Sequence, residues 1–488
     1  MIPSITLTRK EQELENLVVV VSRLSKLPAS VFSAAEKKYV KEQVETLKKE
    51  VVSFNRLTYQ VFICFVKEEK DRWKRLEACR KAGDKIACRL NGRKAVRVAI
   101  FDAEGMTGEV LAVAEGIALG SYQFLKYKKE KKAQEKKNTL KEIELYSTAL
   151  EDLEEKSGPS AVGNLNIVLW AVSRCRDLIN EPNSHLTATV FAREAEKLGR
   201  ASGARVEILN RQKIEALKMG GLLGVNKGSQ EPPTFTVMEW KPGKAVNKKP
   251  YVFVGKGIVF DTGGMNLKPG NYMLNMKDDM SGAAAVAAAV AAIAMAKLPV
   301  HVIGLMPATD NRPGMEAIVS GDILTMHNGM TVEVIDTDAE GRLILADALS
   351  YAGKYDPALV IDLATLTGSA MRAVGKFAAA AMQSGAEQEL ETLASSGFEV
   401  CERLVGFPMW DDYGELMESD LADLKNVGPP EAGMITAGKF LEKFTDYPYI
   451  HLDIAGPAFL EKRDSYRGQG GTGYGVRLLF EFMRRVCG

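Results

Sequence analysis

Hydrophobic residues follow two different spacings along residues 1–127 of this 488-residue chain. Residues 17–24 ("LVVVVSRL"), 59–69 ("YQVFICFVKEE") and 94–102 ("KAVRVAIFD") are apolar runs rich in β-branched and aromatic residues, which predicts strands. Residues 34–51 ("AAEKKYVKEQVETLKKEV") instead place their apolar residues at helical spacing. The mixture of strand and helix patterns predicts a small N-terminal α/β domain over residues 1–127.

The next segment, residues 128–160, is charged along its whole length. Seven lysines lie between Lys126 and Lys137, an acidic stretch ("EDLEE") follows, and Gly158 and Pro159 are stop signals for a helix. This pattern predicts a solvated linker helix whose basic start is offset by its acidic end. A nucleic-acid contact made by the lysines is the less favoured interpretation.

Helix and strand patterns alternate from residue 161 to residue 488. Residues 166–180 predict a helix, and five apolar runs predict strands, at 204–209, 250–260, 300–308, 331–336 and 358–366. This alternation is typical of a mostly parallel or mixed sheet with helices on both faces. We therefore expect an α/β fold of two domains, with functional residues gathered where the strands of the larger, C-terminal domain end.

The composition is that of an ordinary globular protein, with 46% hydrophobic and 26% charged residues and a net charge of +1. This balance predicts no polyanionic partner. Six scattered cysteines without a CxxC pair indicate reduced residues in a cytoplasmic setting, and the first residues lack the pattern of a signal peptide. The apolar run from Ala283 to Ala296 is too short for a bilayer and predicts a buried helix.

Three clusters of charged residues stand at the ends of predicted strands. They are residues 254–270 ("VGKGIVFDTGGMNLKPG"), 276–286 ("MKDDMSGAAAV") and 336–343 ("DTDAEGRL"). The acids Asp338 and Glu340 lie two positions apart, so they point the same way if the backbone between them is extended. Carboxylates crowded in this way repel one another unless positive charge lies between them.

Two residues of these clusters have competing interpretations. Lys256 lies inside an apolar strand, where burial and a nearby cation would favour the neutral amine that can ligate a metal. The alternative is a lysine paired with one of the acids, which strand context alone favours. Asp279 directly precedes the alanine-rich helix, so it is either a helix N-cap, the commoner role, or a metal ligand.

A charge count favours a pair of metal ions. Asp261, Asp279, Asp338 and Glu340 supply four negative charges, which two divalent cations neutralise. None of the four histidines has the HExxH spacing of single-zinc proteases, and His451 fits a hydrogen-bonded core residue better than a ligand. An oxygen-rich ligand set with one amine suits Zn²⁺, Mn²⁺ or Mg²⁺.

Six ordered segments carry a resemblance that extends from about Asn164 to the C-terminus. The segments "VGKGIVFDTGGMNLKP", "MKDDMSGAAAV", "DTDAEGRL", "LATLTGSAM", "HLDIAGPA" and "GGTGYGVRLL" together resemble the leucyl aminopeptidase (cytosol aminopeptidase) family of di-metal exopeptidases. The resemblance implies that residues 161–488 form the catalytic domain. It also implies hydrolysis of N-terminal residues from peptide substrates, and a homohexamer built as a dimer of trimers.

The resemblance also assigns roles to residues of this chain. It implies five metal ligands, with Asp261 and Glu340 bridging both ions: Lys256, Asp261, Asp279, Asp338 and Glu340. Lys268 and Arg342 would be catalytic without binding metal, and Arg342 would hold a bicarbonate ion with help from Leu366 and Gly368. Besides Lys268, the substrate site would include a small or apolar pocket for a Leu-like first residue, made by Met276, Thr365, Gly368, Ala455 and Ala458.

One position departs from the family pattern, because relatives usually carry Asn where this chain has Asp336. The extra carboxylate could raise metal affinity, shift the pH dependence or bond to the backbone, and the last is favoured. Two other functions stay open. A two-metal phosphoesterase would need several arginines near the metals, and only Arg342 stands there. A DNA-binding regulator would need a basic stripe, which the net charge of +1 disfavours.

Overall fold

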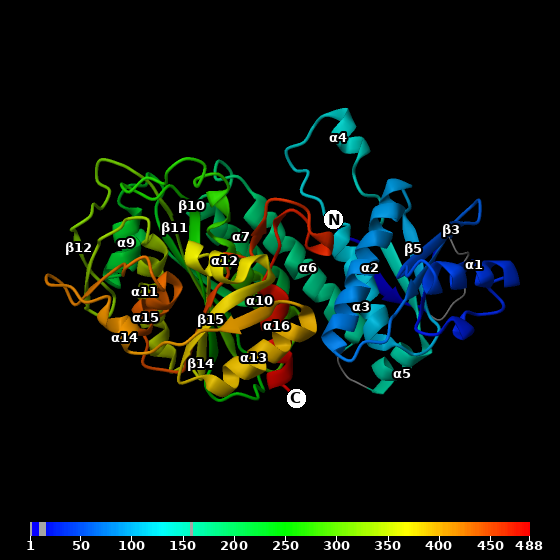
Figure 1. Ribbon diagram of the computed structural model, residues 1–488. Helices are drawn as coiled ribbons and strands as arrows, with labels where there is room; N and C mark the ends of the chain where they lie inside the picture. The colour runs from blue at the N-terminus through cyan, green and yellow to red at the C-terminus, as the bar shows by residue number, and fades with distance from the viewer. Residues whose placement is uncertain (1, 9–15, 157–159) are drawn as a thin grey trace. The chain divides into compact units, whose positions relative to one another are not determined.

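The computed structural model describes residues 2–8, 16–156 and 160–488 (Figure 1). These residues form two compact units. Unit 1 comprises Met1–Ser173 with Lys462–Gln469, and unit 2 comprises Arg174–Glu461 with Gly470–Gly488. The predicted boundary at residue 161 therefore falls at the start of a helix, α6 (Ala161–Asn180), along which the first unit gives way to the second.

Unit 1 contains a six-stranded sheet of order β1-β6-β5-β2-β4-β3, parallel except for β3. Its strands are β1 (Ser4–Leu7), β2 (Leu17–Val21), β3 (Val51–Asn55), β4 (Gln60–Phe65), β5 (Arg97–Asp102) and β6 (Glu142–Tyr146). Its helices before α6 are α1 (Ala34–Glu45), α2 (Arg72–Gly92), α3 (Thr107–Gly120), α4 (Lys131–Glu135) and α5 (Thr148–Lys156). The three strands and the helix expected before residue 127 are thus confirmed as β2, β4, β5 and α1.

The prediction of a linker helix over residues 128–160 is wrong. This segment contributes β6, which pairs with β1 on one side and β5 on the other. Of its described residues, 128–156 and 160, only those of α4 and α5 are helical. Ile143 and Leu145 of β6 are fully buried, and Arg97 pairs with Glu142 at 2.7 Å across the strands. The strand was hidden because its alternating charged residues resemble the surrounding charged sequence. Gly158 and Pro159 lie outside the described residues.

Unit 2 contains a nine-stranded mixed sheet, as expected. Its main path runs β16-β15-β18-β14-β9-β11-β8-β7, and β10 also pairs with β11. The strands are β7 (Arg205–Leu209), β8 (Thr234–Trp240), β9 (Tyr251–Gly255), β10 (Gly257–Asp261), β11 (Val302–Asn311), β14 (Leu359–Ala364), β15 (Ala378–Ser384), β16 (Arg403–Gly406) and β18 (Tyr449–Asp453). The centre of this sheet, β10, β11, β9, β14 and β18, is parallel.

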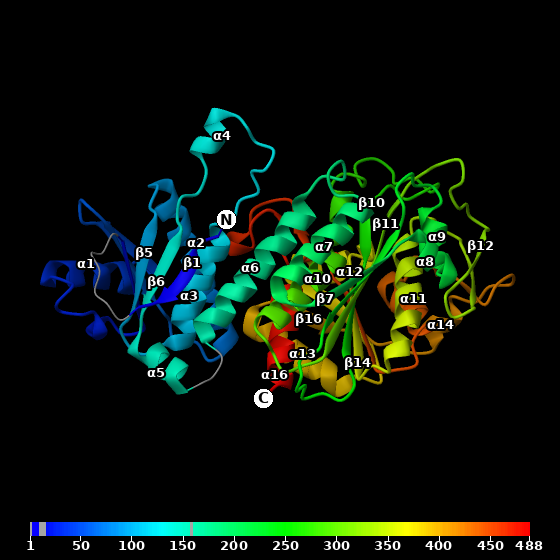
Figure 2. The same ribbon diagram turned by 180° about the vertical axis from the view of Figure 1, so that it is seen from behind.

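Helices cover both faces of the large sheet (Figures 1 and 2). One face carries α7 (Ala188–Ser202), α10 (Ser281–Met295), α13 (Glu387–Val400) and α16 (Val476–Val486). The other carries α8 (Arg211–Ala216), α9 (Gly220–Asn226), α11 (Glu340–Ala352) and α15 (Gly433–Glu442). Two short helices, α12 (Gly368–Val374) and α14 (Asp412–Glu415), complete the unit.

The alanine-rich helix α10 lies directly against the sheet. Its alanines are buried, and a Cβ on Gly282 would collide with the carbonyl oxygen of Leu363, so small residues allow this close approach. The stretch Met276–Met295 is long and apolar enough to cross a membrane, but 89% of its most apolar window is buried within the protein. Its apolar character is therefore explained by its place in the core, as expected from the sequence.

Two predicted strands differ in detail from the structure. Residues 250–260 form two strands, β9 and β10, which separate at Lys256 and both pair with β11. Residues 331–336 contribute only β13 (Thr331–Glu333), which belongs to a three-stranded sheet with β12 (Ile323–Thr325) and β17 (Leu424–Lys425) rather than to the large one. The strands β19 (Phe459–Leu460) and β20 (Gly470–Gly471) form a two-stranded sheet that is separate from the nine-stranded and the three-stranded sheets.

Candidate metal centre

Neighbouring parallel strands bring the candidate residues to one edge of the large sheet. Lys256 follows β9, Asp261 ends β10, Asn311 ends β11 and Thr365 follows β14. Because these strands are parallel, their carboxyl ends meet at the same edge, where α/β sheets place their ligand sites. Glu340 joins them as the first residue of α11.

Three carboxylates converge at this edge. Asp261, Asp338 and Glu340 each place one carboxylate oxygen within 4.8 Å of the other two. Asp261 and Glu340 are buried, with 2% and 1% of their surface exposed, whereas Asp338 is half-buried. Thr337 and Asp338 form a turn that leads into α11, so the backbone is not extended there and the two carboxylates converge through the turn instead.

Asp279 belongs to the same cluster and is not a helix cap. Met280 precedes the first residue of α10, and the helix has no side-chain cap. The Oδ1 atom of Asp279 accepts hydrogen bonds from Lys256 Nζ at 2.8 Å and from Thr365 Oγ1 at 2.8 Å. The capping interpretation is therefore wrong, and Asp279 faces the lysine of the neighbouring strand.

Two lysines lie among the carboxylates. Lys256 Nζ is 2.8 Å from Asp279 and 3.0 Å from Glu340, and it donates to the carbonyl oxygen of Thr365 at 3.0 Å. Lys268 Nζ is 2.7 Å from Asp261 and 2.6 Å from Asp338. The structure thus pairs Lys256 with Asp279 and Glu340, which is the interpretation that strand context favoured.

The same contacts determine the pKa values of the two lysines. Burial disfavours the charged form of both amines, but the surrounding carboxylates, Asp279 and Asp261 foremost, outweigh it and raise each pKa above its ordinary value. Both lysines are consequently ammonium ions in this arrangement.

Burial and neighbouring negative charges disfavour the ionised forms of the carboxylates in this cluster. Burial raises the pKa of Asp279 and of Glu340, and nearby carboxylates raise both further. For Asp338, burial and the charges of Asp261 and Glu340 raise the pKa to about 7. A divalent cation is the usual means by which proteins stabilise several buried carboxylates in their charged forms.

Unpartnered oxygens support a metal-binding role for this cluster. Among the described residues, Asp279 Oδ2 and Glu340 Oε2 are buried without a hydrogen-bond partner. An unsatisfied buried oxygen is costly, and metal coordination is one way to satisfy it. The charge, the free oxygens and the carboxylate spacing all fit the two divalent cations expected from the sequence.

Close packing holds Lys256 in place. A Cβ on Gly341 would collide with Cε of Lys256, so only glycine allows the start of α11 to approach this side chain. The first three residues of α11, "EGR", therefore place a carboxylate, a close contact to the lysine and a guanidinium in consecutive positions.

Asn311 and Thr337 support the cluster and were missed in the sequence. Asn311 Nδ2 donates to Asp261 Oδ1 at 2.9 Å and to the carbonyl oxygen of Thr337 at 3.0 Å, while Thr337 Oγ1 donates to the carbonyl oxygen of Gly263 at 2.6 Å. These bonds join the loop after β10 to the turn before α11. The signal that could have identified Asn311 is its place at the end of an apolar strand.

Arg342 is buried beside the cluster. Its Nη1 donates to the carbonyl oxygen of Asn426 at 2.7 Å, and its Nε is among the buried atoms without a partner in the described part of the chain. Burial lowers the pKa of Arg342 to about 10, which keeps the guanidinium charged at neutral pH. Asn426, which also fixes the backbone of Ile335 and Asp336, gives no signal in the sequence.

Asp336 bonds to the backbone, as the favoured interpretation expected. Its Oδ1 accepts the backbone N–H of Asp338 at 2.9 Å. An asparagine could make the same bond through its amide oxygen, so the extra charge is not required for this contact.

The loops after β14 and β18 carry the remaining predicted residues. Asp453, at the end of β18, accepts hydrogen bonds from Leu366 N (3.2 Å), Thr367 Oγ1 (2.6 Å) and Ala455 N (3.2 Å). This fully buried carboxylate therefore fixes the turn that leads to Gly368 and the loop that carries Ala455 and Ala458. Asp453 stands in the segment "HLDIAGPA", but no role was assigned to it from the sequence.

Met276 belongs to the loop that follows Lys268. It begins a short 3-10 helix, Met276–Asp278, directly before Asp279, and its side chain is half-buried. The residues proposed for the substrate pocket are thus spread over the loops after β10, β14 and β18.

His451 is a core residue, as expected. Its Nδ1 lies 2.8 Å from Asp362 Oδ1 on the neighbouring strand, and both side chains are fully buried. Burial disfavours the imidazolium form, but the Asp362 carboxylate outweighs it and raises the pKa of His451.

Comparisons with known proteins find relatives that match most of this chain. A model of the cytosol aminopeptidase family, catalytic domain, matches residues 173–480. A probable cytosol aminopeptidase of Chlorobaculum tepidum is 46% identical over 383 residues, covering 76% of this chain and 74% of the relative. Another, of Geobacter sulfurreducens, is 42% identical over 409 residues, covering 83% of this chain and 81% of the relative.

Solved structures share the fold of this chain. The bottromycin maturation enzyme BotP in complex with Mn has a TM-score of 0.84 and 27% identity, covering 97% of this chain and 100% of that protein. A mutant of tomato leucine aminopeptidase has a TM-score of 0.84 and 28% identity, covering 99% of this chain and 96% of that protein.

Proposed function

Because the chain belongs to the cytosol aminopeptidase family, a family of metal-dependent hydrolases, we propose that it releases Leu-like N-terminal residues from peptides with two divalent cations. The observation that carries this proposal is the cluster of Asp261, Asp338 and Glu340, whose carboxylates approach within 4.8 Å of one another. Two cations bound there would activate a water for attack on the first peptide carbonyl.

The proposed ligands are Lys256, Asp261, Asp279, Asp338 and Glu340. The unpartnered oxygens of Asp279 and Glu340 support this set. The charges of Asp261 and Glu340 act on both Asp279 and Asp338, which supports bridging roles for Asp261 and Glu340. Lys256 would join as an amine ligand after losing its proton, which nearby divalent charges favour. Zn²⁺ and Mn²⁺ suit this donor set, as does Mg²⁺, and the Mn complex of BotP supports manganese.

Lys268 and Arg342 are the proposed catalytic residues that bind no metal. Lys268 stays protonated among the carboxylates, so it can stabilise the oxyanion that develops on the substrate carbonyl. Arg342 stays charged and cannot act as a base itself, but its unpartnered Nε can hold a small anion. That anion would be bicarbonate, with Leu366 and Gly368 beside it, and it would accept a proton from the attacking water.

The proposed first-residue pocket uses Met276, Thr365, Gly368, Ala455 and Ala458. Thr365 contacts the ligand Asp279 directly, and the alanines lie in the loop that Asp453 fixes. Apolar and small side chains favour a Leu- or Met-like residue by excluding water from it.

We also propose a cytoplasmic location and a homohexamer built as a dimer of trimers. The names of the relatives support the location, and the family resemblance supports the assembly. Size-exclusion chromatography with light scattering tests the assembly, and a mass well below six subunits would contradict it.

Turnover of a panel of aminoacyl amides after metal removal and refilling with single metals tests the function. We expect the chelated protein to be inactive, one or more divalent metals to restore it, and Leu-amide to be among the best substrates. Undiminished turnover after chelation would contradict the proposal, as would a preference for charged first residues.

A further inference from the structure

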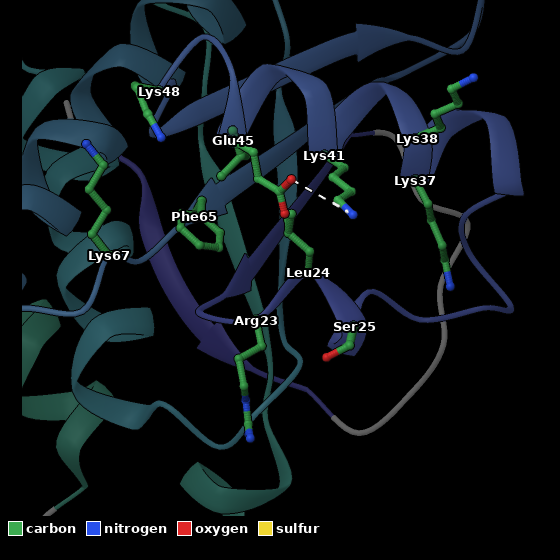
Figure 3. A pocket seen from close by; sticks show the side chains of 11 residues that line it. Arg23, Leu24, Ser25, Lys37, Lys38, Lys41, Glu45, Lys48, Phe65 and Lys67 are labelled. Atoms are coloured by element: carbon green, nitrogen blue, oxygen red, sulfur yellow. Dashed lines mark ion pairs between the residues drawn. The ribbon is translucent and has the colours of Figure 1, made fainter.

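Unit 1 contains a pocket of about 940 Å³ that the peptidase function does not use (Figure 3). Its walls come from one face of α1, from residues 23–25 after β2, and from Phe65 and Lys67 at the end of β4. None of these residues belongs to the metal centre, which lies wholly in unit 2.

The pocket is strongly basic. Among the described residues that line it, one carboxylate, Glu45, stands against six cationic side chains: Arg23, Lys37, Lys38, Lys41, Lys48 and Lys67. Arg23 pairs with Glu104 at 2.9 Å and Lys67 with Glu50 at 3.2 Å. Lys41 reaches Glu45 only at 3.9 Å, a contact that an exposed pair makes weakly.

Three lysines of α1 and its C-terminal side have no ion pair within the described ranges 2–8, 16–156 and 160–488. These are Lys37, Lys38 and Lys48, whose side chains remain half-buried or exposed at the pocket. Lys37 and Lys41 lie four residues apart on one face of α1, and Lys48 lies three residues beyond the C-terminal end of the helix, where it lines the same pocket. Like charges held on one face repel one another, so a bound anion would stabilise this arrangement.

An apolar floor adjoins the charges. Val44 is buried, and the side chains of Leu24 and Phe65 are half-buried. Phe65 lies between Lys48, Lys67 and Leu24 in Figure 3. A partly exposed aromatic ring beside several cations suits a ligand with a flat apolar part and a concentrated negative charge.

The position in the sheet also favours a ligand site. Strands β2 and β4 are parallel neighbours, and the pocket lies at their carboxyl ends. Open α/β sheets bind their ligands at this edge, where loops rather than strands supply the contacts.

We propose that this pocket binds a small molecule carrying two or more linked phosphate groups. A chain of phosphates concentrates several negative charges in little space, which matches lysines acting as point charges around one cavity. An acidic peptide spreads one charge per residue, and a nucleic acid needs a surface longer than a cavity sized for one small ligand. The phosphates could belong to a nucleoside triphosphate or to inorganic polyphosphate.

Isothermal titration of the full-length holoenzyme tests this proposal, with ATP, inorganic tripolyphosphate and adenosine as probes. We expect saturable binding of ATP or tripolyphosphate, and none of adenosine alone. Lys41→Ala/Lys48→Ala should weaken binding at least about tenfold, because each lysine–phosphate contact is charge-assisted. Lys41→Arg/Lys48→Arg should retain binding, and the matched control Lys131→Ala/Lys132→Ala on α4 should change it less than about twofold.

The two phosphate sources are distinguished by Phe65→Leu. This change weakens the binding of ATP but not of tripolyphosphate if a nucleoside stacks on the ring. It weakens the binding of neither probe if the phosphate chain is the whole ligand. Phosphates also chelate divalent cations, so binding that is unchanged in Lys41→Ala/Lys48→Ala would belong to the metal centre and overturn the proposal. It is also overturned if only duplex DNA or anionic vesicles bind through these lysines.

Discussion

Both units place charged side chains at the carboxyl ends of parallel strands, but unit 2 buries these charges and unit 1 leaves them exposed to solvent. In unit 2 the carboxylates of Asp261, Asp279 and Glu340 are buried and lie against two lysines. In unit 1 the cations of the basic pocket remain near water, with Lys41 and Lys67 keeping 64% and 52% of their side chains exposed.

The difference shows what burial requires. Buried carboxylates demand compensation by hydrogen bonds, cations and close packing, so their neighbours are restricted residue by residue. Exposed lysines are solvated and need no partner, so their neighbours are free to vary. The buried cluster therefore depends on single atoms, whereas the basic pocket depends on total charge.

The largest effect should follow from removing a charge of the buried cluster. We expect Asp338→Ala and Lys268→Ala to lower kcat/KM for Leu-amide by at least about 10³-fold, because each loses a group at the reacting centre. Asp336→Asn, two residues from Asp338, is the matched control and should stay within about threefold, since it keeps a backbone acceptor. Wild-type turnover by Asp338→Ala would end the ligand assignment.

Asp347 is a buried acid on the same helix as Glu340, but its hydrogen bonds come from backbone N–H groups rather than from a lysine. It accepts the backbone N–H groups of Leu222 and His327 at 2.9 Å, and burial raises its pKa to about 7. The folded state therefore holds the proton more tightly than the unfolded chain, whose aspartate titrates near pH 4. The free energy of unfolding should consequently fall as pH rises from about 4 to about 7.

The expected loss across that window is about 4 kcal/mol, from about 1.4 kcal/mol per pKa unit. Asp347→Asn removes this titration, so its unfolding free energy should depend less on pH than that of the parent. Denaturant titrations of both proteins at several pH values measure the difference, and identical pH slopes would contradict the assignment.

A smaller effect should follow from loosening the loops around the cluster. Asp453→Asn keeps the size of the side chain but disturbs its bonds to Leu366, Thr367 and Ala455. We expect kcat to fall about tenfold, or about 1.4 kcal/mol, with metal content unchanged. Kinetics combined with elemental analysis tests this, and loss of metal would instead make Asp453 part of the ion-binding framework.

The smallest effect should follow from changes in the basic pocket. Lys41→Ala/Lys48→Ala alters two exposed side chains. The kcat/KM for Leu-amide should therefore stay within about twofold of the parent value, and the free energy of unfolding within about 0.5 kcal/mol. A large loss of peptidase activity would show that the two edges are coupled rather than independent.

The contrast between the units also explains what the sequence could predict. The strands β2, β4, β5, β9, β11 and β14 were visible because buried parallel strands are continuous apolar runs. The strand β6 was not, because its two buried positions alternate with charged residues inside a lysine- and glutamate-rich segment. β18 and β15 were also not predicted, although β18 supplies Asp453 and His451.

The site was predictable as far as its residues stand in motifs. Asp261, Asp279 and Glu340 stand in motifs that contain glycines and lie near strand ends. The structure brings these three residues together. Asn311, Asn426 and Asp453 bond to backbone atoms 26 to 91 residues away, a role that only the folded chain reveals.

Paired divalent ions are proposed to hold the carboxylates of Asp261, Asp279, Asp338 and Glu340 together. Elemental analysis of the purified enzyme, correlated with its turnover, tests this claim directly. We predict about two divalent ions per subunit at full activity, and loss of at least one in Asp338→Ala. A fully active enzyme without stoichiometric divalent metal would contradict the account.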